Sequence, residues 1–233
     1  MQNLASFLHD YGSRLALATL VSVELLIISC VLGFLIAVPV AIGRTSHNRF
    51  AKGVCTAYSS VFRGTPLLVQ LFVIYYGFGQ FEVLRSSLLW IMFSNAFFCA
   101  ALALTLNVGA YLCEHIRAGI LAVPEGEKEA GLAFGFGKMT LLFGVIVPRA
   151  LKAATPAITN EIIVQLKSTA LASTVTVLDL TGHARRLTAQ SYTLDPLIFA
   201  AVIYAALTLI ITLLSRTLER RGNRYMALDT KSA

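Results

Sequence analysis

Long uncharged apolar runs are the feature that most limits what this chain can fold into. Residues 15–43 are almost wholly apolar, and neither 95–108 nor 197–214 contains a charged side chain. A helix of ~20 such residues crosses the hydrocarbon core of a bilayer. Only 13% of the 233 residues are charged and 57% are hydrophobic, so a soluble fold would leave large apolar patches exposed. The sequence therefore predicts an all-α integral membrane protein.

We predict about five transmembrane helices. The first run is too long for the core of a cleavable signal peptide, so it is expected to remain as a span, with Glu24 near the outer headgroups. The fourth span is the least regular, because it contains Glu161 and Lys167. The five predicted spans are 15–43, 56–80, 89–113, 158–178 and 197–214.

The basic residues predict the orientation. The net charge of +7 is interpreted as a topology signal and not as nucleic-acid binding, because Lys and Arg collect in cytoplasmic segments of membrane proteins. Five spans place fourteen of the 19 Lys and Arg on one side and four on the other, with Lys167 inside a span. We therefore expect a periplasmic segment over 1–14, a transmembrane domain over 15–218 and a cytoplasmic basic tail over 219–233.

The longest predicted cytoplasmic loop, about 114–150, shows signals for a short helix with a sharp end. Pro124 suits a first turn, and three acidic residues suit the positive end of the helix dipole: Glu125, Glu127 and Glu129. Left-handed backbone that ends the helix is expected at Gly135 and Gly137. A second short helix is expected over 138–147, before Pro148. A solvated amphipathic loop helix would give the same local pattern.

The same loop resembles a known family motif. Its spacing matches in full the Glu-Ala-Ala loop of the membrane subunits of ABC importers: Glu129-Ala130-Gly131, three residues, Gly135, nine residues, Val145, one residue, Val147-Pro148. Gly131, Val145 and Val147 depart from the usual Ala, Ile and Leu, and Gly131 is expected to loosen the helix. The resemblance implies that Glu129, Ala130, Gly131, Gly135 and Pro148 belong to a loop that docks on an ATP-binding subunit.

Two further segments resemble the polar amino acid branch of that family, which carries histidine, lysine, arginine, ornithine and opines. They are Arg63-Gly64-Thr65-Pro66 with its flanks, and Asn160-Glu161 followed by 166–173; the similarity covers roughly 15–220. The resemblance implies a type I importer permease fold in the bacterial inner membrane. It also implies a second homologous permease, a periplasmic solute-binding protein and a homodimeric ATPase that holds ATP and Mg.

Both segments also have a physical interpretation of their own. Arg63 is expected near the cytoplasmic boundary of the second span, where its long stem can reach water. Gly64 and Pro66 permit a kink whose freed backbone groups neighbours must satisfy. A structural role for this segment, Thr65 included, is favoured over contact with substrate.

The fourth span is where we expect the substrate pathway. Charged groups inside a bilayer cost at least ~2.5 kcal/mol, so they usually face the protein interior or water. At about 100° per residue, Asn160 and Lys167 share one sector of the helix, while Glu161, Gln165 and Ser168 share the next. Glu161 could hold the cationic group of a basic amino acid. It could equally pair with the partner permease or lie near a membrane end.

Several enzyme classes lack their motifs in this chain. Leu132 stands where a phosphate-binding loop ending at Gly137-Lys138 would need its first glycine, and no His-Glu-x-x-His or nucleophile elbow occurs. The four cysteines show no metal-ligand spacing. We therefore expect a transport subunit without cofactor or metal, energised by another chain. The alternative is a self-sufficient secondary transporter or channel for small cationic solutes, which needs no docking loop.

Overall fold

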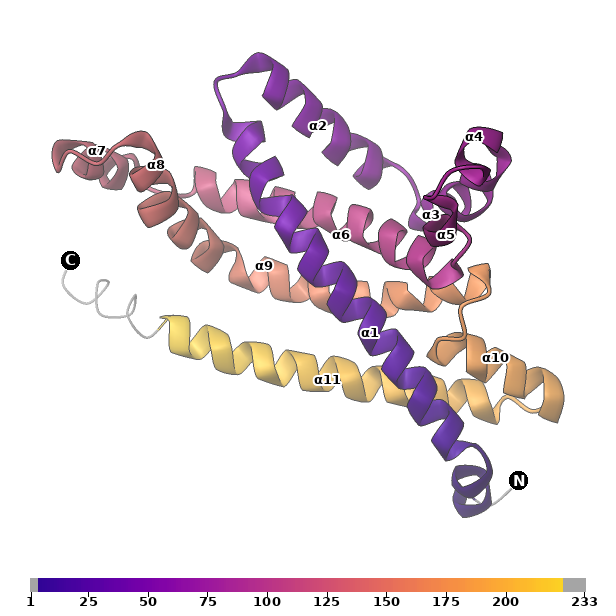
Figure 1. The fold of residues 1–233 in the computed structure, drawn as a ribbon. Helices are drawn as coiled ribbons and strands as arrows, with labels where there is room; N and C mark the ends of the chain where they lie inside the picture. Colours follow the sequence, from indigo (N-terminus) through magenta and orange to yellow (C-terminus); the bar gives the residue numbers. More distant parts are fainter. Residues whose placement is uncertain (1–3, 224–233) are drawn as a thin grey trace.

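The computed structural model describes residues 4–223, and the side chains of residues 12–217. Residues 1–3 and 224–233, parts of the predicted N-terminal segment and basic tail, lie outside the described residues. Within the described part the fold is helical and contains no strand, which confirms the all-α prediction. Its helices, shown in Figure 1 with short π and 3-10 turns between some of them, are α1 Leu4–Thr45, α2 Arg49–Gly64, α3 Leu67–Phe72, α4 Glu82–Arg85, α5 Trp90–Phe93, α6 Ala96–Leu121, α7 Glu125–Ala133, α8 Lys138–Leu141, α9 Val147–Ser168, α10 Leu180–Ser191 and α11 Asp195–Asn223.

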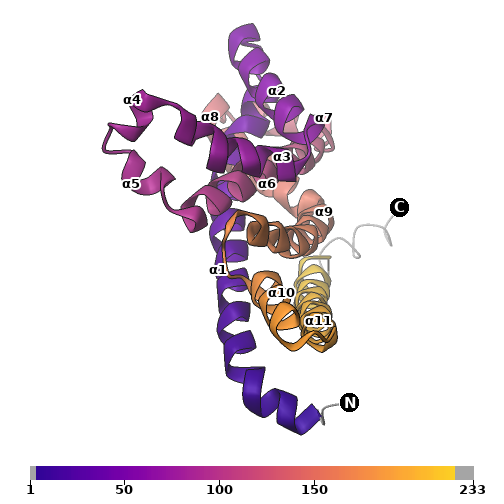
Figure 2. The same cartoon turned by 90° about the vertical axis from the view of Figure 1, so that its right-hand side faces the viewer.

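The centre of the fold is the packing of α1 on α6 and of α6 on α9. In Figure 1 α1 crosses α6, α9 and α11, and the loop helices α7 and α8 lie at the opposite end of the bundle from α10. Figure 2 shows α4 and α5 projecting to the side away from α11. The buried core is built from small and aliphatic side chains of α1, α6 and α9, including Ala37, Ala103, Val108 and Ala150. Small residues let membrane helices approach closely, because packing replaces the hydrophobic effect there.

The described residues contain four candidate membrane spans, or five if one bent helix pair counts as a span, in agreement with the predicted number of about five. Four helices are long and apolar enough to span a membrane, and a pair bent by 104° makes the fifth: Gly12–Thr45, Ala96–Leu121, Lys138–Val175, Asp195–Thr217, and Arg49–Gly64 with Leu67–Gln80. Several bounds differ from the prediction: the second crossing starts at Arg49 and not at 56, and the third starts at Ala96 and not at 89. The third helix continues from 113 to Leu121 because its charged residue Glu114 is paired with arginines. The fourth begins at Lys138, twenty residues before the predicted start.

The helix predicted to stop before Pro148 does not stop there. A π turn over Leu142–Ile146 leads directly into α9, and Pro148 occupies the first turn of that helix. Proline removes an N–H donor and crowds the preceding turn, and a wider π turn accommodates both effects. The proline was predicted to be a boundary, whereas in the structure it lies inside the continuous helical segment of the fourth crossing.

The helix α10 was not predicted from the sequence. Asp179 caps its start by accepting hydrogen bonds from the backbone amides of Thr181 (3.3 Å) and Gly182 (2.9 Å). The Tyr204 hydroxyl of α11 donates to the same carboxylate at 3.3 Å. Burial raises the pKa of Asp179, against the lowering effect of these hydrogen bonds. The buried face of α10 packs on α1 and α11 through Leu180, Ala184 and Leu187.

Removing the Asp179 cap should destabilise this end of the bundle. We expect Asp179→Ala to lower the free energy of unfolding by about 1–2 kcal/mol, because two helix N–H groups lose their acceptor. Asp179→Asn keeps an acceptor oxygen and should retain most of the stability. Thermal unfolding of the detergent-purified variants measures the difference, and equal losses in both would contradict a capping role.

Candidate functional site

The loop helix α7 ends in the manner that the sequence predicts. Gly135 has a left-handed backbone with φ of +80°, and its amide donates to the Leu132 carbonyl at 2.9 Å. The Phe136 amide donates to the Gly131 carbonyl at 3.0 Å, which completes a Schellman cap. The prediction for Gly137 was wrong: its φ is −66° and it starts α8 with extended backbone. One glycine therefore suffices to end α7.

Gly131 is the site of a close contact and not of a loosened helix. It is buried, and a Cβ atom there would lie 2.5 Å from Cδ1 of Leu141 and 3.6 Å from Cδ2 of Phe136. The glycine lets α7 pack directly against α8. The departure from the family's alanine thus fits the local packing.

The outer surface of this loop combines acidic and apolar side chains. Glu129 and Ala130 are exposed. Beside them in the sequence are large apolar side chains that are also exposed: Leu132 (56%), Phe134 (84%) and Met139 (68%). Apolar groups gathered on a loop are typical of an interaction surface. We refer to Glu129, Ala130, Leu132, Phe134 and Met139 as the loop surface.

An ion pair ties the loop helix to the fourth span. The Arg149 guanidinium donates two hydrogen bonds to the Glu127 carboxylate, one of them from Nε to Oε2 at 2.8 Å. Arg149 follows Pro148 at the start of α9, so the pair joins α7 to α9. The same guanidinium holds the pKa of Glu127 below its usual range. The bidentate geometry fixes orientation as well as distance.

The Arg63-Gly64-Thr65-Pro66 segment is the bend of the second crossing, which confirms the predicted kink. The helix α2 ends at Gly64, α3 begins after Pro66, and the two are bent by 104°. The freed carbonyls find partners inside the protein. Nε2 of Gln70 donates to the carbonyls of Phe62 (2.8 Å) and Thr65 (3.0 Å), and Asn107 of α6 donates to the Phe62 carbonyl at 3.1 Å. Both amide side chains are buried.

Arg63 belongs to a charge cluster around Glu114 of α6. Its Nη1 lies 3.4 Å from Oε1 of Glu114, and its guanidinium lies over the Tyr111 ring at 5.6 Å. Arg117 pairs with the same carboxylate at 3.1 Å, and Arg44 of α1 pairs with it as well. One acid therefore holds arginines from α1, α2 and α6. Sequence reasoning missed this cluster because its members are far apart in the chain.

The polar residues of α9 point in two directions. Glu161 and Gln165 are buried. Oε2 of Glu161 lies 3.3 Å from Nε2 of His115 on α6, and Gln165 donates to Oγ of Ser29 on α1 at 2.9 Å. These contacts fasten α9 to its neighbours. His115 carried no spacing signal in the sequence.

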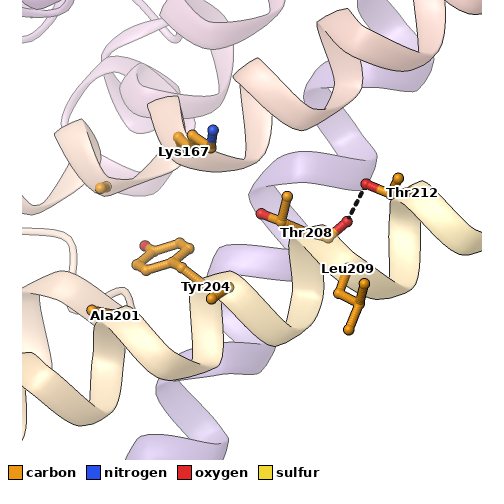
Figure 3. A pocket seen from close by; sticks show the side chains of 8 residues that line it. Lys167, Ala201, Tyr204, Thr208, Leu209 and Thr212 are labelled. Carbon is orange, nitrogen blue, oxygen red and sulfur yellow. Dashed lines mark hydrogen bonds between the residues drawn. The ribbon is translucent and has the colours of Figure 1, made fainter.

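The remaining candidates of α9 lie elsewhere. Asn160 and Lys167 are exposed, and Ser168 donates to the Val164 carbonyl of its own helix at 3.0 Å. Lys167 lines a groove of about 620 Å³ between α9 and α11 (Figure 3). Ser168, which was expected in one sector with the buried Glu161 and Gln165, is half-buried and bonds to its own helix, so the structure does not unite the five residues in one site.

Comparison with known proteins gives a consistent set of relatives. Residues 29–224 match the family model described as binding-protein-dependent transport system inner membrane component. The chain is 40% identical to the octopine transport system permease protein of Rhizobium radiobacter, over 87% of this chain and 86% of that one. It is also 40% identical to the arginine ABC transporter permease protein of Haemophilus influenzae, over 96% and 99%. A crystal structure of an amino acid ABC transporter with histidines matches with a TM-score of 0.82 and 34% identity, over 95% and 99%.

The bend gives a stability prediction. We expect Gln70→Ala to lower the free energy of unfolding by about 1–3 kcal/mol, because the Thr65 carbonyl loses its side-chain donor and the Phe62 carbonyl keeps only Asn107. Gln70→Glu keeps the size of the side chain but removes the amide donor, so it should be as damaging as Gln70→Ala. Thermal unfolding of the purified variants tests this. Gln80→Ala, at the end of the same crossing, is the matched control; a loss there equal to that of Gln70→Ala would contradict a special role for Gln70.

Proposed function

Since the chain belongs to the family of binding-protein-dependent transport system inner membrane components, we propose that its loop docks on an ATP-binding subunit and couples ATP hydrolysis to import. The chain is a permease subunit of an amino acid ABC importer, a multi-pass protein of the inner membrane and not an enzyme. The observation that carries the docking proposal is the exposed loop around α7, whose helix has a Schellman cap at its end and an ion pair to α9. A self-sufficient carrier, the alternative raised by the sequence, finds no support among the relatives.

Each residue of the proposed docking loop has a distinct part. Glu129 and Ala130 are exposed and available for contact, together with the apolar side chains of the loop surface. Gly131 and Gly135 set the shape of α7 through a close contact and a left-handed turn. Pro148 lies in the first turn of α9, after the π turn that follows α8. A helix with fixed ends can transmit force from a partner, because a rigid element shifts as a unit.

The orientation follows from the distribution of basic residues. We place the N-terminal segment 1–14 in the periplasm, the transmembrane domain over 15–218, and the loop of about 114–150 with the tail 219–233 in the cytoplasm. Fourteen of the 19 Lys and Arg are then cytoplasmic. The same arrangement puts the loop surface on the side where ATP is found.

The proposed assembly contains several other chains. A second, homologous permease would complete the translocation path, and a periplasmic binding protein would deliver the substrate. A homodimeric ATPase would hold ATP and Mg, so this chain itself needs no cofactor. The names of the relatives, which include octopine and arginine, favour a polar and basic amino acid or an opine as substrate. Nucleic acid has no place in this assembly.

The pathway is proposed to run beside α9. Glu161 and Gln165 hold the inner side of this helix through α6 and α1, while Asn160, Lys167 and Ser168 lie on its other sides. ATP-driven movement of the loop would shift α9 through the Glu127–Arg149 pair. The substrate path would then open alternately to the two sides, provided that the ATPase contacts the loop differently in the two states. Arg63 to Pro66 are assigned a structural part in this movement.

Co-purification of a tagged chain from mild detergent tests the assembly. We expect a second permease and an ATP-binding subunit to be recovered with ATPase activity. Glu129→Arg should lose the ATP-binding subunit, whereas Glu82→Arg on the distant helix α4 should retain it. A wild-type chain that purifies alone and moves solute into liposomes without ATP would overturn the proposal.

Replacement of the capping glycine tests coupling separately from assembly. Gly135→Val should lower uptake per assembled complex about five- to thirtyfold, because a left-handed β-branched residue costs about 1–2 kcal/mol. Gly137→Val is the matched control, since that backbone is extended and open space surrounds the Cβ position. Uptake and ATPase activity of equal amounts of complex are the measurements. Normal uptake by well-expressed Gly135→Val would refute the coupling role.

A further inference from the structure

The groove between α9 and α11 has the size of a small-molecule site. Its volume is about 620 Å³, within the range of ligand pockets of ~300–1,000 Å³. The walls are largely apolar, and they come from the end of α9, the turn that follows it and one side of α11: Lys167, Ala170, Ala201, Tyr204, Thr208 and Leu209 among others. Figure 3 shows Lys167 on one side of the groove and Tyr204 and Thr208 on the other.

Two polar groups of the groove have no assigned partner. Across the described side chains, residues 12–217, neither the Lys167 ammonium nor the Thr208 hydroxyl makes a hydrogen bond or ion pair. Tyr204 differs, because its hydroxyl is engaged with Thr181 and Asp179 at the start of α10. Thr212 differs as well, since its hydroxyl donates to the Thr208 carbonyl at 2.7 Å (Figure 3). The groove thus offers one cation and one free hydroxyl.

The position of Lys167 in this largely apolar groove favours an anionic ligand. Thr208 lies near the middle of the span Asp195–Thr217, and Lys167 lies across the groove from it. An intramembrane ammonium is costly unless it faces water or an opposite charge. The buried Glu161 is engaged with His115 on the inner side of α9, so it does not serve Lys167.

We propose that Lys167 and Thr208 bind the carboxylate of the transported amino acid in the groove between α9 and α11. The inference rests on the proposed function and adds the chemistry of one contact. Amino acids and opines share a carboxylate, whereas their side chains differ, so a lysine here recognises the common part. The cationic side chain of a basic substrate must lie away from Lys167, because like charges repel.

Substitutions of Lys167 and Thr208 test this assignment. The measurement is the binding of two probes by the purified complex of permease and ATPase. The probes are L-arginine and agmatine, which is arginine without its carboxylate. Lys167→Met should weaken L-arginine binding about tenfold, because a hydrogen bond to a charged group is lost. The same substitution should leave agmatine binding unchanged. Lys167→Arg should stay within about threefold of wild type, and Thr208→Val should weaken L-arginine binding by about threefold. Lys52→Met on α2 is the matched control for loss of a lysine.

Two outcomes would overturn the assignment. Lys167→Met could leave L-arginine binding unchanged, or it could weaken L-arginine and agmatine binding alike. In the first case, loss of co-purified phospholipid, measured by native mass spectrometry, would assign the groove to a lipid phosphate. Recovery of the ATP-binding subunit with ATPase activity in the same preparations shows that the proposed function stands even where the carboxylate assignment fails.

Discussion

Backbone groups that are freed where a helix is interrupted need hydrogen-bond partners, and inside a bilayer only the protein can supply them. At the 104° bend, Gln70 and Asn107 supply the donors that the freed carbonyls need. At the end of α7, Gly135 turns the chain so that its own amides close the helix. At the start of α10, Asp179 accepts from the first amides. At each of these three breaks the freed backbone groups are therefore bonded within the protein.

Much of this was predictable because the signals are local. Apolar runs gave the five crossings, and the arrangement of Glu125 to Gly135 gave a short helix with a glycine stop. Gly64 and Pro66 gave the kink. Each of these depends on neighbours within a few residues, or on the ~20-residue thickness of the membrane. The helical angle likewise separated Asn160 and Lys167, which are exposed, from Glu161 and Gln165, which are buried.

The rest depends on residues that are distant in the sequence. Glu114 meets Arg44 and Arg63 only because α1, α2 and α6 converge. His115 of α6 contacts Glu161 of α9, and no sequence spacing predicts that pair. Pro148 was read as a stop because the π turn before it, which makes room for its ring, has no clear sequence signal. The groove beside Lys167 likewise exists only once α11 has folded back along α9.

The Glu127–Arg149 pair also sets a mechanical scale. Arg149 and Lys167 belong to the same 22-residue helix, and 18 residues at 1.5 Å each separate them by about 27 Å. If α9, which contains Pro156, turned as a unit, a tilt of about 5° at the loop end would displace the Lys167 end by about 2 Å over that length. A small rotation would thus move the Lys167 end of α9 by a distance similar to the H···O separation of a hydrogen bond, ~2 Å. A contact on one side of the groove can thus be made or broken without any refolding of α9.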